Sequence, residues 1–401
     1  MKIGWFSNWF TFDYLRDSGV PKNIREIPII NELLKRGKLV WLGTQRNPPG
    51  CSHKNVINFG GLFEGLPHYS KEKWGNTANY VHDIAQNYPK YAKRELPDVD
   101  CVFVRVLPSF IYENAKIYIM LYQYGLRGIP VFARDLELLM IKKFIVGDDF
   151  LCTDGKTIKG KPFGISGSDK AFNMDEWWMV MNKNLYILAP FSPQGRIWLQ
   201  DRAKHLKLLT FHFPYDPKLY PTMNPGQMNR SITYIGNDTG RRHGFNKYFS
   251  GLPPDTVYVY GGQARQVDKT QKGFPETLRA RLPNVVWHGP VPHYRVNVIY
   301  KHSFACMNIP RPYFNSVGFV SARFLEAVFS GALLLLPKEF LSAKFYTCDN
   351  RLVIEDSSQL KILVRTISKS EKLDILEKQR SRLKQICDVE TNVDRVMETI
   401  R

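Results

Sequence analysis

The sequence predicts an α/β protein built from two successive units, each with a mainly parallel sheet. Short apolar runs alternate with helical patterns in the first half of the chain, and the same alternation starts again in the second half. A proline-rich stretch separates the two series. A chain of 401 residues with 44% hydrophobic content is long and apolar enough for two hydrophobic cores.

The first unit begins with apolar runs that we expect to be buried strands. These runs are residues 2–6, 39–42, 101–106, 130–133 and 186–188. Residues 24–36 have apolar side chains at helical spacing, and Gly37 follows as the expected C-terminal cap. Two polar segments, 65–98 and 147–177, are too long for turns between a strand and a helix. We expect these segments to be functional insertions or mobile loops.

The second unit repeats the pattern after a connector. Residues 211–228 contain four prolines and no periodicity, which is typical of an interdomain hinge. The expected strands that follow are residues 231–235, 257–260, 285–287, 304–307, 333–336 and 351–354. From residue 371 onward the chain is charged and amphipathic, so we expect it to be helical.

The composition narrows the class of protein. The formal net charge is +19, from 56 Lys and Arg against 37 Asp and Glu, which favours a polyanionic partner: nucleic acid, a membrane surface or a phosphorylated ligand. The six cysteines are widely scattered and have no zinc-ligand spacing, so we expect reduced thiols in a cytosol. No signal peptide and no membrane-spanning apolar segment are expected.

Glycine-bearing turns follow three strands of the second unit: residues 236–242 (GNDTGRR), 261–265 (GGQAR) and 287–292 (WHGPVP). Glycine lets backbone N–H groups approach a ligand, and ligands of open α/β sheets bind at the carboxyl ends of strands. The arginines of the first two turns could bind a diphosphate. Neither a GxGxxG nor a GxxxxGK[ST] pattern is present, which argues against a dinucleotide fold or a P-loop.

Arg323 and Glu326 lie one helical turn apart in SARFLEAVFSGALLLLP, residues 321–337. A carboxylate can accept hydrogen bonds from both hydroxyls of a ribose, and an arginine one turn earlier can reach the adjoining phosphates. The alternative is a solvated surface ion pair, which is common and individually weak.

The order of YIGNDTGRR, VYVYGGQAR, VVWHGPVP and SARFLEAVFSGALLLLPKEF resembles the nucleotide-binding half of the DNA β-glucosyltransferase family of T-even bacteriophages. The resemblance implies a GT-B fold, with two Rossmann-like domains facing each other across a cleft, and a UDP-sugar donor. It implies that Arg323 contacts the diphosphate, that Glu326 contacts the ribose and that the backbone at Val291 holds the uracil. The further implied phosphate contacts are Asn237, Gly240, Arg241 and Arg242.

The resemblance extends more thinly over the first half. VFARDLELL is similar to the family segment with the catalytic aspartate, which implies that Asp135 is the base of an inverting transfer. The alternative is that Asp135 is a helix N-cap. The loop DSGVPK, with Gly19, matches a turn near the donor sugar, and Glu26 lies near an acidic residue of the family that implies a sugar or acceptor contact. For Glu26 the alternative is an exposed helix carboxylate.

The acceptor implied by the resemblance is a modified pyrimidine such as 5-hydroxymethylcytosine, flipped out of double-stranded DNA. Arg127, Lys142 and Lys143 would then contact DNA phosphates, although each could simply be solvated. The loop at residues 308–319 has no acidic residue, unlike that of the family, so the donor could be UDP-glucose or UDP-arabinose. Mg²⁺ or Mn²⁺ would bind the diphosphate, and we expect no metal ligand set in the protein.

The resulting prediction is an enzyme with an acceptor and DNA-binding domain at 1–205, a linker at 206–228, a UDP-sugar-binding domain at 229–375 and a C-terminal helix at 376–401 that returns to the first domain. We expect a monomer in the host cytoplasm, without membrane attachment. Two alternatives stay open. One is a GT-B glycosyltransferase with a carbohydrate or lipid-linked acceptor, and the other is a nucleic-acid-binding protein with a degenerate donor site.

Overall fold

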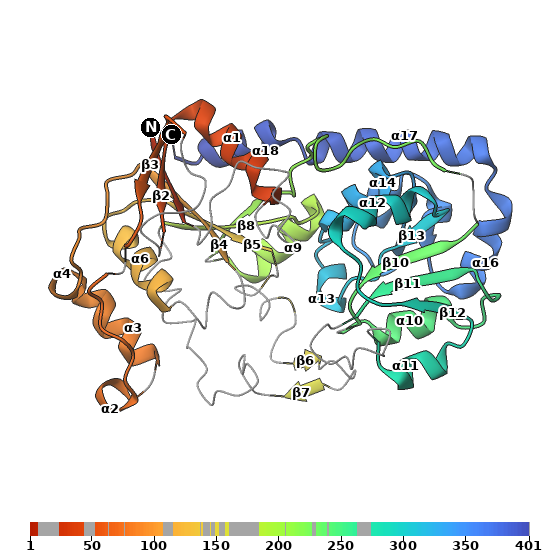
Figure 1. Ribbon diagram of the computed structural model, residues 1–401, viewed down its shortest axis with the longest axis horizontal. Helices are drawn as coiled ribbons and strands as arrows, with labels where there is room; N and C mark the ends of the chain where they lie inside the picture. The colour runs from red at the N-terminus through yellow and green to blue at the C-terminus, as the bar shows by residue number, and fades with distance from the viewer. Residues whose placement is uncertain are drawn as a thin grey trace.

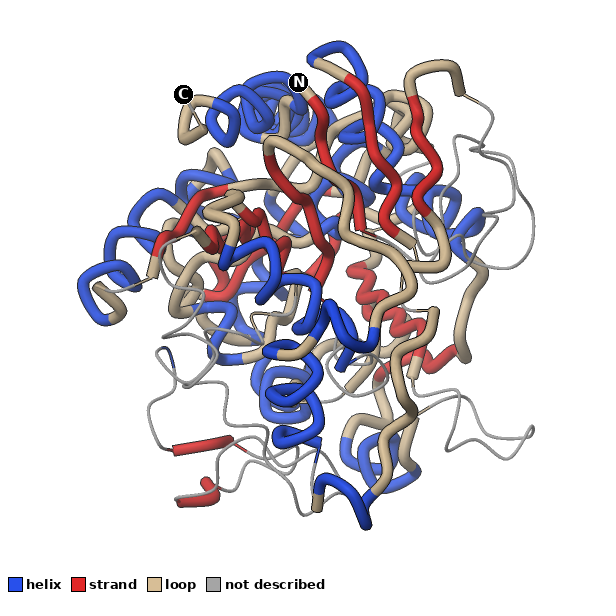
Figure 2. Tube along the Cα trace, turned by 90° about the vertical axis from the view of Figure 1, so that its left-hand side faces the viewer, coloured by secondary structure: helices blue, strands red, loops and turns tan. Residues whose placement is uncertain are grey.

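The computed structural model describes residues 1–6, 24–43, 53–62, 64–75, 77–106, 115–136, 138, 145, 149–151, 157–159, 184–204, 206–226, 230–238, 240–262 and 274–400. These residues form two lobes, each centred on a parallel sheet, with the first lobe on the left of Figure 1 and the second on the right. The prediction of an α/β protein with two sheets is confirmed. Both ends of the chain lie beside the first sheet (Figure 2).

The first sheet has seven parallel strands in the order β3-β2-β1-β4-β5-β8-β9. Its strands are β1 Lys2–Phe6, β2 Lys38–Leu42, β3 Val56–Phe59, β4 Cys101–Val106, β5 Val131–Asp135, β8 Leu185–Ala189 and β9 Lys207–Thr210. Its helices are α1 Ile27–Arg36, α6 Ala115–Leu126 and α9 Pro193–Arg202, and a three-ten turn, η1 Ile24–Glu26, precedes α1. β9 extends this sheet into the stretch 206–228 that was expected to be a linker.

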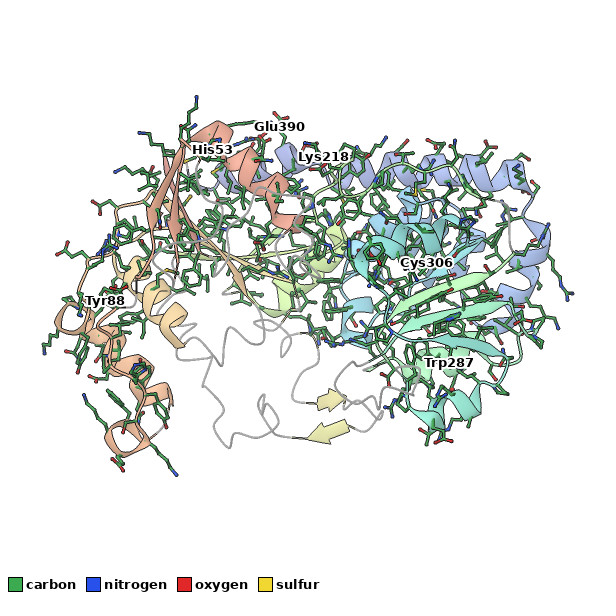
Figure 3. All side chains as sticks on the ribbon, viewed as in Figure 1. His53, Tyr88, Lys218, Trp287, Cys306 and Glu390 are labelled. Carbon is green, nitrogen blue, oxygen red and sulfur yellow. The ribbon has the colours of Figure 1, made fainter. Side chains whose placement is uncertain are left out.

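The two long polar segments differ from each other. Residues 65–98 hold α2 Lys71–Trp74, α3 Thr77–Gln86 and α4 Tyr88–Tyr91, so the described part of this segment contains helices. Buried Tyr88 anchors this segment to the core, and its hydroxyl donates to the Leu62 carbonyl (Figure 3). In the second segment the described residues form an antiparallel hairpin, β6 Asp149–Leu151 and β7 Thr157–Lys159.

The second sheet has six parallel strands in the order β12-β11-β10-β13-β14-β15. These are β10 Ile232–Gly236, β11 Val257–Gly261, β12 Val285–His288, β13 Ala305–Met307, β14 Leu333–Pro337 and β15 Val353–Ile354. The helices are α10 Arg242–Phe249, α11 Glu276–Arg281, α12 His293–Lys301, α13 Pro312–Asn315, α14 Ala322–Phe329, α15 Ala343–Thr347 and α16 Ser357–Thr366, with a three-ten turn η2 Asn350–Leu352. Trp287 and Phe274 pack together in its core (Figure 3).

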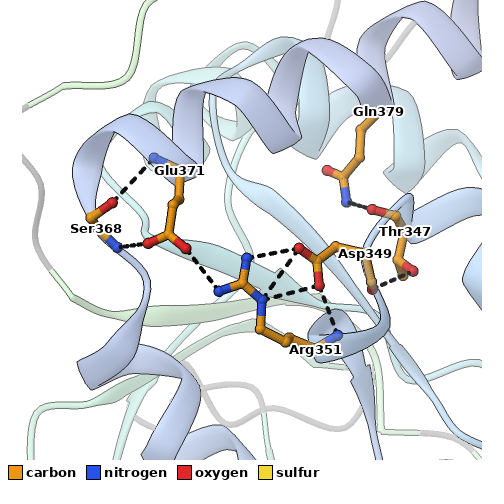
Figure 4. A network of polar contacts seen from close by, with 6 residues as sticks. All are labelled: Thr347, Asp349, Arg351, Ser368, Glu371 and Gln379. Carbon is orange, nitrogen blue, oxygen red and sulfur yellow. Dashed lines mark hydrogen bonds and ion pairs between the residues drawn. The ribbon is translucent and has the colours of Figure 1, made fainter.

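Two C-terminal helices cross from the second lobe to the first: α17 Lys369–Ile386 and α18 Val389–Met397. A capping box of Ser368 and Glu371 starts α17, and Arg351 binds both Glu371 and Asp349 beside it (Figure 4). α18 packs against α1, where Arg36 binds Asp394 at 2.5 Å. The end of the chain thereby rests on the first lobe. Among the described residues, no helix combines the length and hydropathy needed to cross a bilayer.

Candidate functional site

A buried carboxylate on α14 lies at the centre of the candidate site. Glu326 is only 1% exposed, and its Oε2 accepts a hydrogen bond from Nη1 of Arg323 one turn earlier. The remainder of α14 packs its apolar face into the core, which fixes the direction of both side chains. The alternative of a solvated surface pair is wrong, because the carboxylate is removed from water.

The second oxygen of this carboxylate has partners from two other elements. Nη2 of Arg25, in η1 of the first lobe, donates to Glu326 Oε1 at 2.5 Å. His293, the first residue of α12, places its Nε2 3.4 Å from the same oxygen and 3.3 Å from Nη2 of Arg25. Burial alone would raise the pKa of Glu326, but Arg323, Arg25 and His293 together hold that pKa well below its ordinary value. Glu326 is therefore an ionised carboxylate at neutral pH.

Backbone contacts join the three glycine-bearing turns at the carboxyl edge of the second sheet. The N–H of Gly262 donates to the Gly236 carbonyl at 3.1 Å, and the N–H of Gly261 donates to the Gly289 carbonyl at 3.1 Å. Gly261 has φ +124°, and a Cβ there would overlap the Gly236 carbonyl oxygen, so glycine is required. Val291, two residues past Gly289, is partly buried against an apolar cluster that includes Ile235 and Val296.

The arginines of the first turn are held by their neighbours. Arg241 donates from Nη1 to the side-chain oxygen of Asn237 at 2.6 Å and from Nε to the Ile309 carbonyl at 2.8 Å. Arg242 donates from Nε to the buried Asp238 at 2.9 Å. Gly240, which lies between β10 and these two arginines in the sequence, has φ +69°. Burial raises the pKa of Tyr234, and the positive charges of Arg241 and Arg323 oppose that rise. Tyr234 is therefore a common neighbour of this turn and of α14.

A second buried carboxylate lies in the first lobe. Glu26, the residue after Arg25, is 2% exposed and accepts from Nη1 of Arg134 at 3.2 Å, while Nη1 of Arg105 lies 3.4 Å away. The alternative of an exposed helix carboxylate is wrong. Burial lowers the pKa of Arg134 to about 10, an effect that Glu26 opposes and Arg105 reinforces. Arg105 and Arg134 are register partners on β4 and β5.

Asp135 follows Arg134 and ends β5, and its backbone pairs with Val106. The residues just after the neighbouring strand β8 contact the second lobe. There the N–H of Ser192 donates to the Val317 carbonyl at 3.1 Å, and the N–H of Val320 donates to the Pro190 carbonyl at 2.8 Å. Residues 317–320 precede α14, so the carboxyl edge that ends at Asp135 borders the lobe with Arg323 and Glu326.

Comparisons with known proteins bear on this arrangement. Residues 245–400, less than half of the chain, match a family model described as glycosyl transferase-like. The comparison with curated proteins gives no significant match. Solved structures of similar fold include T4 phage β-glucosyltransferase (BGT) with its UDP-glucose substrate, at 13% identity, 99% coverage of this chain, 97% of that chain and a TM-score of 0.54. The same T4 phage protein is also known with UDP and Mn²⁺, at 13% identity, 100% and 99% coverage and a TM-score of 0.52.

Two further structures have comparable similarity. Sucrose-phosphate synthase of Thermosynechococcus elongatus has 13% identity, coverage of 99% and 98%, and a TM-score of 0.57. An E. coli protein described as trehalose-6-phosphate, with bound UDP-2-fluoro glucose, has 10% identity, coverage of 100% and 99%, and a TM-score of 0.56. The chain has the GT-B fold. The predicted fold class is thus confirmed by full-length likeness to several proteins.

The structure brings some of the predicted site residues together and places others elsewhere or outside the described residues. The structure brings together Arg323 and Glu326 on α14 and joins Asn237, Gly240, Arg241 and Arg242 in one turn. Arg127 follows α6 and lies four residues before β5, at the edge of the sheet opposite to the end of that strand. Its Nη1 donates to the Leu96 carbonyl at 3.1 Å. Gly19, Lys142 and Lys143, and the side chain of Asp135, lie outside the described residues.

Among the charged and titratable partners of the predicted donor residues, the prediction missed Arg25, His293 and Asp238. Asp238 had a usable signal, since it lies four residues before Arg242 in the quoted turn. His293 follows the quoted WHGPVP turn directly and begins a helix that packs against α14. Arg25 had no signal, because it is 301 residues from Glu326 and its partner is set by the packing of the two lobes.

Proposed function

We propose that this protein is an inverting glycosyltransferase that moves a sugar from a UDP-sugar to the hydroxyl of 5-hydroxymethylcytosine, or a related modified pyrimidine, in DNA. The observation that carries the proposal is the buried, ionised Glu326 beside Arg323, at the point where the two lobes of the GT-B fold meet. A buried carboxylate with hydrogen-bonding capacity is suited to a vicinal diol, and an adjoining guanidinium is suited to a phosphate.

In this proposal the second lobe binds the donor. Glu326 accepts from the ribose hydroxyls, and Arg323 binds the diphosphate together with the turn that contains Asn237, Gly240, Arg241 and Arg242. The backbone at Val291 holds the uracil. The match of residues 245–400 to a glycosyl transferase-like family supports this, because the range includes α14 and Val291. So does the bound UDP-glucose of T4 phage BGT.

The first lobe provides the acceptor side. Asp135, at the end of β5, removes the proton from the attacking hydroxyl while the diphosphate leaves from the opposite face of the sugar. No covalent intermediate is needed, since a single displacement inverts the anomeric carbon. The position of Asp135 at a strand end that borders the second lobe supports this role. Glu26, enclosed by two arginines, would act on the sugar or acceptor only through its neighbours.

DNA is the proposed acceptor because of the net charge of +19 and the likeness to T4 phage BGT. The remaining proposed DNA contacts are Arg127, Lys142 and Lys143, and Gly19 is a proposed contact to the donor sugar. The donor is UDP-glucose or UDP-arabinose. Mg²⁺ or Mn²⁺ would enter with the diphosphate, as part of the substrate, which the T4 phage BGT structure with UDP and Mn²⁺ supports. We propose a cytoplasmic monomer with the domain limits given above.

The test is incubation of duplex DNA containing 5-hydroxymethylcytosine with a panel of UDP-sugars, followed by mass spectrometry of the nucleosides. We expect a mass gain of one hexose or one pentose on the modified base. Unmodified DNA of the same sequence is the control. Absence of a mass gain with every donor would overturn DNA as the acceptor.

A carbohydrate acceptor is the second candidate, favoured by the likeness to sucrose-phosphate synthase. It uses the same donor half and predicts UDP release with sugar phosphates but not with DNA. A coupled assay for UDP, run with both acceptor classes, separates the two candidates.

A further inference from the structure

Arg25 is a cation of one lobe that ends on a buried anion of the other lobe. Its side chain is 35% exposed, whereas the side chain of its partner Glu326 is 1% exposed. The contact at 2.5 Å is a charge-assisted hydrogen bond, the stronger class of such bonds. Since Arg25 also lies 3.3 Å from His293, its guanidinium fills the space in front of this carboxylate from the side of the first lobe.

The hydrogen-bonding capacity of Glu326 decides what this contact means for a donor. Each carboxylate oxygen accepts about two hydrogen bonds. Oε2 accepts from Arg323, while Oε1 has both Arg25 and His293 as neighbours. A ribose that binds through two hydroxyls needs room at both oxygens, and among the described residues Arg25 and His293 already lie in front of Oε1. One of the two neighbours of Oε1 must move before the ribose can bind.

Arg25 is the neighbour that can move. His293 and Glu326 belong to α12 and α14, which pack against each other within the second lobe, so their relative positions are fixed by that packing. Arg25 comes from the opposite lobe, through a long and partly exposed side chain. A cation that is one-third exposed can leave an ion pair and be solvated at modest cost.

We propose that Arg25 is a donor-site residue that exchanges partners: it pairs with Glu326 in the empty protein and moves to the diphosphate when the UDP-sugar binds. The inference rests on the proposed function, because it requires that Glu326 bind the ribose. Arg323, on the other oxygen of the same carboxylate, would bind that diphosphate, so the phosphates are the nearest new anion for the displaced guanidinium. Donor binding is thereby coupled to the contact between the lobes.

The exchange predicts opposite effects on two ligands. Uridine must displace Arg25 from Glu326 without offering it a new anion, so Arg25 opposes uridine binding. UDP displaces Arg25 and binds it, so Arg25 favours UDP binding. In Arg25→Ala, uridine should therefore bind about fivefold more tightly and UDP about tenfold more weakly, in line with the strength of charge-assisted hydrogen bonds. A residue with a purely structural role would not shift the two affinities in opposite directions.

The experiment is isothermal titration calorimetry of uridine and UDP with the wild-type protein, Arg25→Ala and Arg25→Gln. Arg351→Ala is the matched control, since Arg351 is likewise a partly exposed arginine in a three-ten turn with carboxylate partners, here Asp349 and Glu371, and η2 is not one of the donor turns. We expect the ratio of the two dissociation constants to change about fiftyfold in both Arg25 variants and to stay the same in the control. Urea unfolding midpoints identify a variant that fails to fold. If Arg25→Ala fails, the two affinities of Arg25→Gln, which keeps most of the side chain, test the exchange.

The outcomes separate the two proposals. If the wild-type protein binds neither uridine nor UDP, the donor assignment is wrong and the exchange is wrong with it. If it binds both, but an Arg25 variant weakens both equally or changes neither, the donor assignment stands and the exchange is overturned.

Discussion

Glu26 and Glu326 are both buried carboxylates with two arginine neighbours, yet they are built differently. Glu26 is held by Arg105 and Arg134, whose positions are fixed by the register of two adjacent strands of the same sheet. Glu326 is held by Arg323 from its own helix and by Arg25 from the other lobe. The first arrangement can change only if the sheet is disrupted. The second can change when a side chain moves, which is what a ligand site requires.

The two clusters are linked through the chain. Arg25 and Glu26 are consecutive residues of the three-ten turn η1, and they point into different clusters. Because Glu26 is anchored to the first sheet, it holds the turn from which Arg25 reaches Glu326. The comparison therefore favours a stabilising role for Glu26 beside the binding role proposed for Glu326, and substitutions can separate these roles.

The largest effect is expected for Glu26→Gln. Removing this charge takes away the carboxylate that Arg134, almost completely buried, has among the described side chains. Breaking a buried pair in this way costs about 3 kcal/mol of unfolding free energy. Chemical denaturation measures it, with Glu355→Gln as the control, since Glu355 forms an exposed pair with Lys338 and should lose at most about 0.5 kcal/mol. Equal stability of the two variants would contradict the structural role of Glu26.

Glu326→Gln should lose more activity and less stability than Glu26→Gln. The amide cannot attract Arg323 and is a weaker acceptor for the ribose, so kcat/KM for UDP release should fall about 100-fold, or about 2.7 kcal/mol. The unfolding free energy should fall less than in Glu26→Gln, because Arg25 and Arg323 are each about one-third exposed and can be solvated. Steady-state kinetics and denaturation of the same preparation test both statements. A variant with full activity but lost stability would reverse the assignment.

The sequence predicted the sheets better than the clusters. β1 and β4 have the predicted limits, because an uninterrupted apolar run is a local signal for a buried strand. β3 and β9 were missed, since both are short edge strands with mixed side chains. The edge strands β12 and β15 of the second sheet were predicted, so position at an edge hides a strand only where its side chains are also mixed.

The candidate site depends on contacts that no local pattern contains. Arg323 and Glu326 could be paired from the sequence, because they are one helical turn apart. The burial of Glu26 could not be predicted, as Arg134 is 108 residues away and Arg105 becomes a neighbour only through strand pairing. The partnership of Arg25 with Glu326 depends on how two lobes meet, so it required the structure.

His212 is a buried titratable group of another kind, because no counter-charge lies beside it among the described residues. It lies just after β9, and its Nδ1 has no hydrogen-bond partner among the described residues. Burial lowers the pKa of His212 to about 3, and the charge of Arg395 contributes in the same direction. Where Glu326 stays ionised through its arginines, His212 stays neutral. The contrast predicts a loss of stability that begins near pH 6.5, above the pH range in which a paired carboxylate loses its contribution.

The sign follows from the two states. Below about pH 6.5 His212 is protonated in the unfolded chain but not in the folded protein. The contribution of His212 to the unfolding free energy is therefore complete above this pH and decreases as the pH falls toward 3. The loss is about 1.4 kcal/mol per pH unit, or about 2 kcal/mol between pH 6.5 and 5. The unfolding free energy of the wild-type protein should fall between pH 6.5 and 5. In His212→Gln this fall should be smaller by about 2 kcal/mol. His53→Gln, at an exposed histidine (Figure 3), should leave the difference unchanged. If His212→Gln loses as much stability between pH 6.5 and 5 as the wild-type protein, the burial of His212 is not the cause of that loss. The contrast with the arginine-paired carboxylates would then lose its physical basis.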